Sequence, residues 1–76
     1  MSNAGYEITD QFERTVGDHK EGVVLAYKDK PYIGREYVTW EFTDYGERSY
    51  FWGHYYCDQG AALEDFFDRV ALQKGV

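Results

Sequence analysis

The sequence predicts an α+β fold: an antiparallel sheet of three or four strands, formed by β-hairpins, with one C-terminal α-helix packed on one face. Two observations lead to this prediction. Apolar and polar residues alternate along much of the first 57 residues, as they do in strands that are buried on one side. From residue 58 onward, the apolar residues recur at helical spacing instead. The change of period marks the predicted boundary between sheet and helix.

The chain is short and rich in aromatic residues. Its 76 residues form a single predicted domain, in which we expect residues 1–5 to be disordered or derived from a tag. A domain of this size buries only about 60% of the surface of its unfolded chain. Aromatic residues make up 20% of the sequence, and each one that is buried removes roughly 150–250 Å² from water. This aromatic content compensates for a thin core.

Four segments carry the strand pattern, with a polar loop after the first and a proline-containing loop after the second. These segments are residues 6–16, 23–28, 36–43 and 49–57. The first two flank "GDHKEG" and predict one hairpin. The last two flank "DYG" and predict a second hairpin, with Gly46 in the left-handed conformation of a three-residue loop.

The predicted register of the second hairpin places Trp40 opposite Tyr50 and Val38 opposite Trp52. All even-numbered residues of the two strands then share one face, which we expect to form the core under the helix. A slip of one residue would exchange the two faces of a strand. The predicted core face comprises Val38, Trp40, Phe42, Tyr50, Trp52, His54 and Tyr56.

The last segment predicts a helix over residues 59–74. Asp58 is a suitable N-cap, because its carboxylate can accept from the free backbone N–H groups of the first turn. The apolar residues at helical spacing are expected to face the sheet, and three acidic residues, Glu64, Asp65 and Asp68, the other side. The predicted apolar side comprises Ala62, Leu63, Phe66, Phe67 and Val70.

The odd-numbered residues of the second hairpin predict a partner-binding surface. Tyr37, Phe51 and Tyr55 would form an exposed aromatic patch on the sheet face that a single helix leaves uncovered, with Gly53 leaving a shallow depression among them. Such a patch would bind a protein partner or a second copy of the chain. The alternatives are ordinary surface aromatics, or an N-terminal segment that folds over them.

Composition and spacing argue against several chemistries. The formal net charge of −6 disfavours direct contact with nucleic acid or an anionic membrane surface. One cysteine and two histidines do not supply a zinc site, and one cysteine cannot form an intramolecular disulfide. We expect no cofactor, no metal and no catalytic residues, and therefore no enzymatic activity. Without a signal peptide or a membrane span, the sequence predicts a cytoplasmic protein.

Several of these stretches resemble a family. "YEIT", "YVTWEF" and "YFWGHYY", followed by an acidic residue and a helix containing alanines, resemble a small uncharacterised domain associated with conjugative transposons and related mobile elements of Firmicutes. The resemblance covers most of residues 6–72, and "KDKPYIGRE" departs from shorter relatives. It implies a cytoplasmic bacterial protein encoded on a mobile element, and no catalytic residue comes with it.

These observations lead to two main hypotheses of function. The first is a non-enzymatic protein-interaction module that binds through the aromatic patch or through Glu64, Asp65 and Asp68 of the helix. The second is an acidic mimic of nucleic acid that inhibits a DNA-binding enzyme, which requires carboxylates aligned along one surface. A small-ligand binder or enzyme that uses the aromatic stretch is a third alternative.

Overall fold

The computed structural model describes residues 1–75 and contains an antiparallel sheet of five strands and one helix. The elements in chain order are β1 (Ser2–Asn3), β2 (Tyr6–Val16), β3 (His19–Lys30), β4 (Gly34–Asp44), β5 (Arg48–Tyr56) and α1 (Gln59–Lys74). Each strand lies beside the next one in the chain, in the order β1-β2-β3-β4-β5. The predicted α+β class is confirmed, and the sheet has five strands rather than three or four.

The additional strand is β1, in the segment that the sequence predicts to be disordered or tag-derived. Ser2 and Asn3 pair with Glu7 and Tyr6, and the backbone N–H of Ile8 donates to the carbonyl of Met1 at 2.9 Å. The chain therefore turns back on itself at its N-terminus and extends the sheet by one short strand.

The helix has the predicted bounds and the predicted cap. Asp58 precedes its first residue in an extended conformation, and the Asp58 carboxylate accepts from the backbone N–H of Ala61 at 2.9 Å. The C-terminal end is closed by the N–H of Gly75, which donates to the carbonyl of Ala71. Within residues 1–75, no helix combines the length and the apolar character that crossing a membrane requires.

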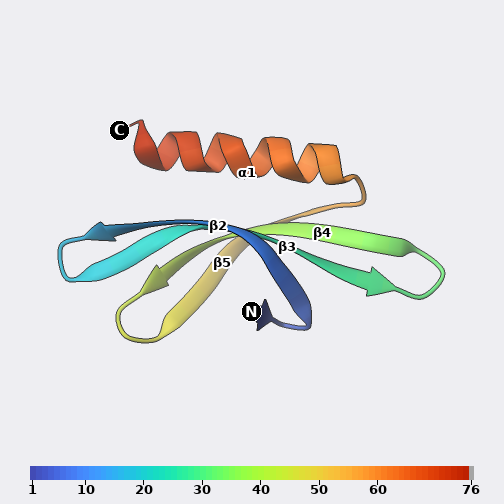
Figure 1. Cartoon of the computed structure of the whole chain (residues 1–76), viewed down its shortest axis with the longest axis horizontal. Helices are drawn as coiled ribbons and strands as arrows, with labels where there is room; N and C mark the ends of the chain where they lie inside the picture. The colour runs from blue at the N-terminus through green and yellow to red at the C-terminus, as the bar shows by residue number, and fades with distance from the viewer. Residues whose placement is uncertain (76) are drawn as a thin grey trace.

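Helix α1 packs on one side of the sheet, which we call the helix face (Figure 1). Ala62 and Phe66 of the helix form a buried cluster with Val23 and Leu25 of β3. Partly buried residues from the neighbouring strands and from the helix complete this layer. They are Phe12, Tyr37, Tyr56, Leu63 and Val70. The helix face is therefore centred on β3, and not on the β4–β5 hairpin as the sequence predicts.

The opposite side of the sheet is a second core, which we call the concave face. The sheet curls so strongly that side chains of β2 and β5 meet across it, although β3 and β4 separate these strands. Arg48 of β5 donates to Gln11 and Glu13 of β2, at 2.7 Å in each case. The buried residues of this face are Tyr6, Val24, Ala26, Val38, Trp40 and Phe42, with Ile8 and Tyr50 packed against them.

The predicted core face was therefore placed on the wrong side of the sheet. Val38, Trp40 and Phe42 are buried as predicted, but they point away from the helix. A single helix indeed covers only one face. Curling of the sheet buries the other face. This long-range effect is not visible in the alternation of apolar and polar residues along each strand.

Two irregularities in the ladder move residues from one face to the other. In β2 the register shifts between Ile8 and Asp10, which places Ile8 on the concave face and Phe12 on the helix face. In β5 the register shifts opposite Trp40, so that His54 and Tyr56 lie on the helix face rather than beside Trp40.

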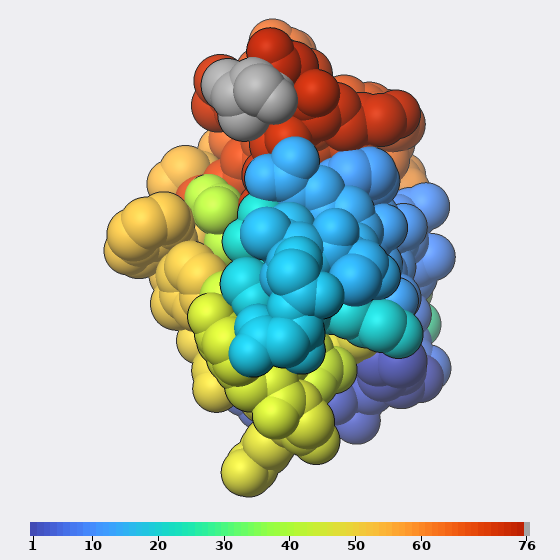
Figure 2. All heavy atoms as spheres, turned by 90° about the vertical axis from the view of Figure 1, so that its left-hand side faces the viewer, coloured from blue at the N-terminus to red at the C-terminus, as the bar shows by residue number. Residues whose placement is uncertain are grey.

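The loop between β4 and β5 also differs from the prediction. Thr43 pairs with Ser49, and Phe42 rather than Trp40 lies opposite Tyr50. The tip of this hairpin lies beside the tip of the β2–β3 hairpin (Figure 2). The rings of His19 and Tyr45 stack between the two tips, with their centroids 4.3 Å apart.

Candidate functional site

The bulge in β5 presents a tryptophan from the edge of the sheet. Glu41 pairs with Phe51 and Thr39 with His54, so that two residues of β5, Trp52 and Gly53, oppose Trp40. Trp52 lies in the left-handed region with a φ of 53°. Large residues rarely adopt this conformation, because their Cβ atom crowds the following carbonyl oxygen. The bulge therefore holds Trp52 in a strained backbone geometry.

Gly53 explains why the chain bulges at this point. A Cβ atom at position 53 would lie 2.8 Å from Trp40 Nε1 and 3.1 Å from a ring carbon of Tyr55. Only glycine lets the β5 backbone approach the buried indole of Trp40 so closely. The backbone turns at Trp52 to make this approach, and the Trp52 side chain points into solvent as a result.

The side chain of Trp52 is largely in solvent. Its exposed fraction is 70%, whereas that of Trp40 is 6%. The Phe51 ring meets the Trp52 indole edge to face, with the centroids 5.1 Å apart. The site therefore consists of a solvent-facing indole, in edge-to-face contact with one aromatic ring, on β5, which is an edge strand of the sheet that residues 1–75 form.

The three residues of the predicted aromatic patch do not share a face. Tyr37 packs beneath the helix in the apolar layer, and Phe51 lies on the same helix face, opposite Glu41. Tyr55 lies on the concave face, opposite Val38, with its ring centroid 6.2 Å from that of Tyr6. Its exposed fraction is 55%. The β5 bulge separates Phe51 from Tyr55, so the predicted patch is wrong as a single surface.

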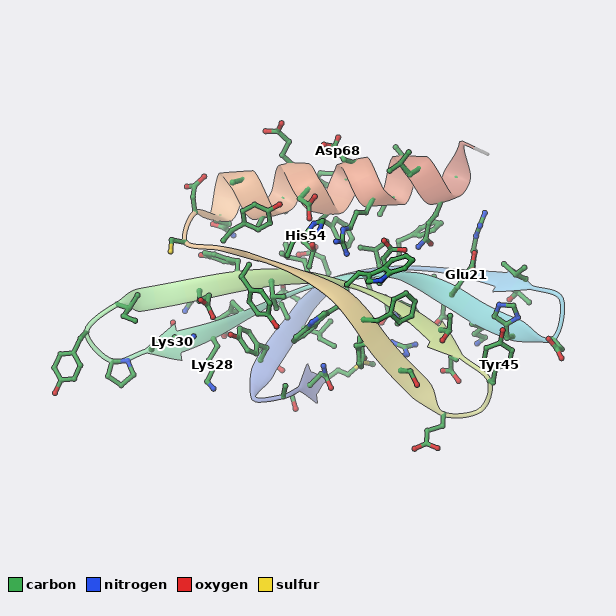
Figure 3. The ribbon with its side chains drawn as sticks, turned by 180° about the vertical axis from the view of Figure 1, so that it is seen from behind. Glu21, Lys28, Lys30, Tyr45, His54 and Asp68 are labelled. Carbon is green, nitrogen blue, oxygen red and sulfur yellow. The ribbon has the colours of Figure 1, made fainter. Side chains whose placement is uncertain are left out.

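The three acidic residues of the helix also divide between two environments. Glu64 and Asp68 are exposed, and Figure 3 shows Asp68 on the outer side of α1. Asp65 instead points toward the sheet, where its carboxylate bonds to β4 and β5 side chains. Asp65 is therefore a residue of the helix–sheet interface and not part of an acidic surface.

Asp65 is the centre of a polar cluster beneath the helix. One carboxylate oxygen, Oδ2, accepts from Thr39 Oγ1 at 2.6 Å and lies 3.0 Å from His54 Nδ1. Figure 3 shows His54 between β5 and the helix. Burial alone would raise the pKa of Asp65, but the hydrogen bonds from Thr39 and His54 outweigh it and hold that pKa below its usual value. Burial and the charge of Asp65 raise the pKa of Tyr56.

The cluster continues toward the C-terminal end of the helix. Arg69 is buried and lies 3.5 Å from Asp65 and 3.8 Å from Glu41. The Gln73 amide donates to the carbonyl of Gly22 at 3.2 Å. These contacts fix the helix on the sheet in one rotation about its own axis, which determines which residues face solvent.

The geometry of the cluster does not assemble a nucleophilic site. The carboxylate of Asp65 orients His54, as in catalytic dyads, but the hydroxyl on the same carboxylate belongs to Thr39, which is fully buried. Cys57 is exposed in the short connection between β5 and α1. Among residues 1–75, no group of three or more His, Cys, Asp or Glu side chains could hold a metal ion.

Sequence reasoning assigned Trp52 to the core and missed its exposure. The signal was present in Gly53, because a glycine inside a strand pattern is typical of a bulge. Comparison of the chain with protein-family models, with curated proteins and with solved structures finds no match in any of the three. The geometry of the molecule is therefore the basis for a functional hypothesis.

Proposed function

We propose that the protein is a non-enzymatic protein-interaction module whose contact surface is centred on Trp52. The observation that supports this proposal is a strained and exposed tryptophan at a bulge in the edge strand, in contact with a second aromatic ring. A non-glycine residue in the left-handed region raises the energy of the fold by about 1–3 kcal/mol. Trp52 has this conformation while its indole is 70% exposed, so packing within the chain offsets little of that energy.

A partner that buries the Trp52 indole would offset this unfavourable energy. Tryptophan is enriched among the residues that dominate the energy of protein interfaces, since it offers a large rigid surface and one N–H donor. The Phe51 ring supports the indole at 5.1 Å and limits its movement. A partner could also bind by adding a strand along the free edge of β5. The bulge interrupts that edge, and this favours binding through the indole instead.

The arrangement of charge favours this proposal over mimicry of nucleic acid. A mimic needs a row of unpaired carboxylates, and seven of the fourteen Asp and Glu side chains, all within residues 1–75, lie within ion-pair distance of a lysine or arginine. These seven are Glu13, Glu21, Asp29, Glu36, Glu41, Asp44 and Asp65. Pairing reduces the negative potential that a DNA-binding enzyme would recognise.

Selection of peptide ligands tests the proposal without a known partner. A phage-displayed peptide library would be panned on the parent protein, and the enriched peptides measured by titration against the parent and Trp52→Gly. Glycine tolerates a positive φ, so this variant removes the indole and relaxes the strain together. We expect Trp52→Gly to weaken binding at least about tenfold, the loss typical of a central interface residue.

The matched control is Tyr32→Gly. Like Trp52, Tyr32 is an exposed aromatic residue with a positive φ, and it lies in the β3–β4 turn, so its replacement removes an exposed ring and relaxes the backbone away from β5. Binding should survive in this variant. Failure to enrich any ligand, or ligands that bind Trp52→Gly as tightly as the parent, would contradict the proposal.

A further inference from the structure

The exposed apolar residues of α1 lie on two different sides of the helix. The sequence predicts that both Phe66 and Phe67 pack on the sheet, and this is wrong for Phe67, whose exposed fraction is 62%. Phe67 and Lys74 are almost two helical turns apart and therefore share one side of the helix. The Lys74 amine lies over the ring of Phe12 in β2, 5.6 Å from its centroid. Phe67 thus lies on the β2 side of the helix.

Leu72 lies on the other side of the helix, toward β5. It follows Asp65 by almost two turns, so these two side chains share one side of the helix. The Asp65 carboxylate lies 3.0 Å from the His54 ring of β5. The Leu72 side chain has an exposed fraction of 70%. The side of α1 that overlooks β5 therefore carries one large exposed apolar residue.

Leu72 and Trp52 lie at the same level of the interface between helix and strand. Glu41 is the partner of Phe51, the residue that precedes Trp52. The amide of Gln73, the residue that follows Leu72, donates to the Glu41 carboxylate at 3.5 Å. Leu72 and Trp52 are both 70% exposed. The indole of Trp52 thus has an apolar counterpart on the helix.

A groove lies between β5 and the N-terminal half of the helix. It is lined by Tyr56, Ala61, Glu64, Asp65 and Asp68. Glu64 and Asp68 are exposed, and none of the salt bridges among residues 1–75 involves either of them. These two carboxylates can therefore pair with a cation. The ring of Tyr56 lies in the same groove, and aromatic rings also attract cations.

The groove and the Trp52–Leu72 pair are about 12 Å apart. On β5, Tyr56 follows Trp52 by four residues, which is about 13 Å along a strand. On the helix, Leu72 follows Glu64 by eight residues, which is about 12 Å along the axis. The two elements give the same separation, and about four residues of extended peptide cover it.

We propose that the partner of Trp52 is an extended basic segment of a protein. One apolar side chain of the segment packs between Trp52 and Leu72. A lysine or arginine about four residues away pairs with Glu64 and Asp68. The net charge of −6 attracts a basic partner over a longer range. This inference rests on the proposed function, because it names the chemistry of the segment that Trp52 binds.

Peptides selected on the parent protein test the charged contact. We expect them to carry a lysine or arginine about four residues from an apolar residue. The double variant Glu64→Gln with Asp68→Asn should bind them about threefold to tenfold more weakly, because each exposed ion pair contributes modestly. The matched control, Asp10→Asn with Glu47→Gln, changes the net charge equally at exposed positions outside the groove. This control should bind as the parent does.

Leu72→Ser and Phe67→Ser test the apolar contact. Each variant removes a large exposed apolar side chain from α1, so both should keep the far-ultraviolet circular dichroism of the parent. Leu72→Ser should weaken binding by about threefold to tenfold, since a partner buries this side chain beside Trp52. Phe67→Ser should bind as the parent does, because Phe67 lies on the β2 side. Equal affinities of these two variants would show that the segment does not contact the helix, and would overturn the inference.

The remaining outcomes separate the inference from the proposed function. Peptides that require Trp52 but lack a basic residue would overturn the basic segment and leave the proposed function standing. Peptides that bind the Glu64/Asp68 double variant as tightly as the parent would do the same. An equal loss in the charge control would show general attraction rather than pairing in the groove, and would also overturn the inference. Failure to select any peptide that depends on Trp52 would overturn both.

Discussion

The backbone of Gly53 lies directly against the indole of Trp40, so that a Cβ atom at position 53 would come within 2.8 Å of Trp40 Nε1. This contact joins the edge strand to the concave core. It also sets the position of the bulge, and the bulge turns Trp52 outward. The exposed residue of the candidate site thus depends on a buried residue of the core.

The first prediction concerns this contact. Gly53→Ala should lower the free energy of unfolding by about 1–3 kcal/mol, because the added methyl group must displace Trp40 or the β5 backbone. Denaturant unfolding measures the change. Ser49→Ala is the control on the same strand, at an exposed position, and should change the stability by less than about 0.5 kcal/mol. If both variants unfold at the midpoint of the parent, the close approach does not exist.

The curl of the sheet supplies the second prediction. The guanidinium of Arg48 bonds to Gln11 and Glu13 across the concave face and lies 4.0 Å from the ring centroid of Phe42. Arg48→Met keeps an unbranched side chain but removes these bonds, and should lower the free energy of unfolding by about 1–3 kcal/mol.

Arg35→Met is the matched control for Arg48→Met. Arg35 also bonds to a carboxylate, Asp29, and also stacks at 4.0 Å on a ring, that of Tyr27. That pair is solvent-exposed and joins neighbouring strands only, so its loss should change the free energy by less than about 1 kcal/mol. Equal effects of the two variants would contradict the role of Arg48 in closing the sheet.

The third prediction concerns pH. Hydrogen bonds hold the pKa of Asp65 below its ordinary value of 3.8 despite burial. Asp65 therefore contributes stability that is fully present above the pKa of the unfolded chain and is lost as the pH falls through the lower pKa of the folded state. At pH 7, Asp65→Asn should lower the free energy of unfolding by about 1–3 kcal/mol.

Unfolding of the parent and of Asp65→Asn at several pH values checks this account. The difference between the two proteins should shrink as the pH is lowered below about 4. Asp68→Asn is the control on the outer side of the helix, and it should resemble the parent at every pH. A difference between the parent and Asp65→Asn that stays constant down to about pH 3 would show that the Asp65 carboxylate is not specifically stabilised.

The sequence predicts the four long strands and the helix, but it misses β1, makes the second strand, 23–28, shorter than β3 (His19–Lys30), and does not predict which residues share a face. The N-cap at Asp58 and the change of period there predict the bounds of α1, and alternation predicts β2 from Tyr6 to Val16. Face assignment requires an uninterrupted period of two, and one bulged residue reverses it. The bulge at Trp52 therefore moved His54 and Tyr56 to the helix face.

Local sequence patterns could not predict the concave core, for a different reason. Its closure depends on contacts such as those of Arg48 with Gln11 and Glu13, which are separated by 37 and 35 residues. Trp40 and Phe42 were recognised as core residues because they are large and apolar. Which layer would cover them depends on how far the whole sheet curls, and no local signal encodes that curl.

The stability of Trp52→Gly tests the central claim most directly, because it asks whether Trp52 serves the fold at all. Gly at this position accepts the positive φ of 53° without strain, and removal of a mostly exposed indole forfeits little burial. In denaturant unfolding at pH 7, we predict that the midpoint of Trp52→Gly equals or exceeds that of the parent. A midpoint lowered by an amount equivalent to more than about 1 kcal/mol would show that Trp52 stabilises the domain, and would contradict its assignment as a residue held outward for a partner.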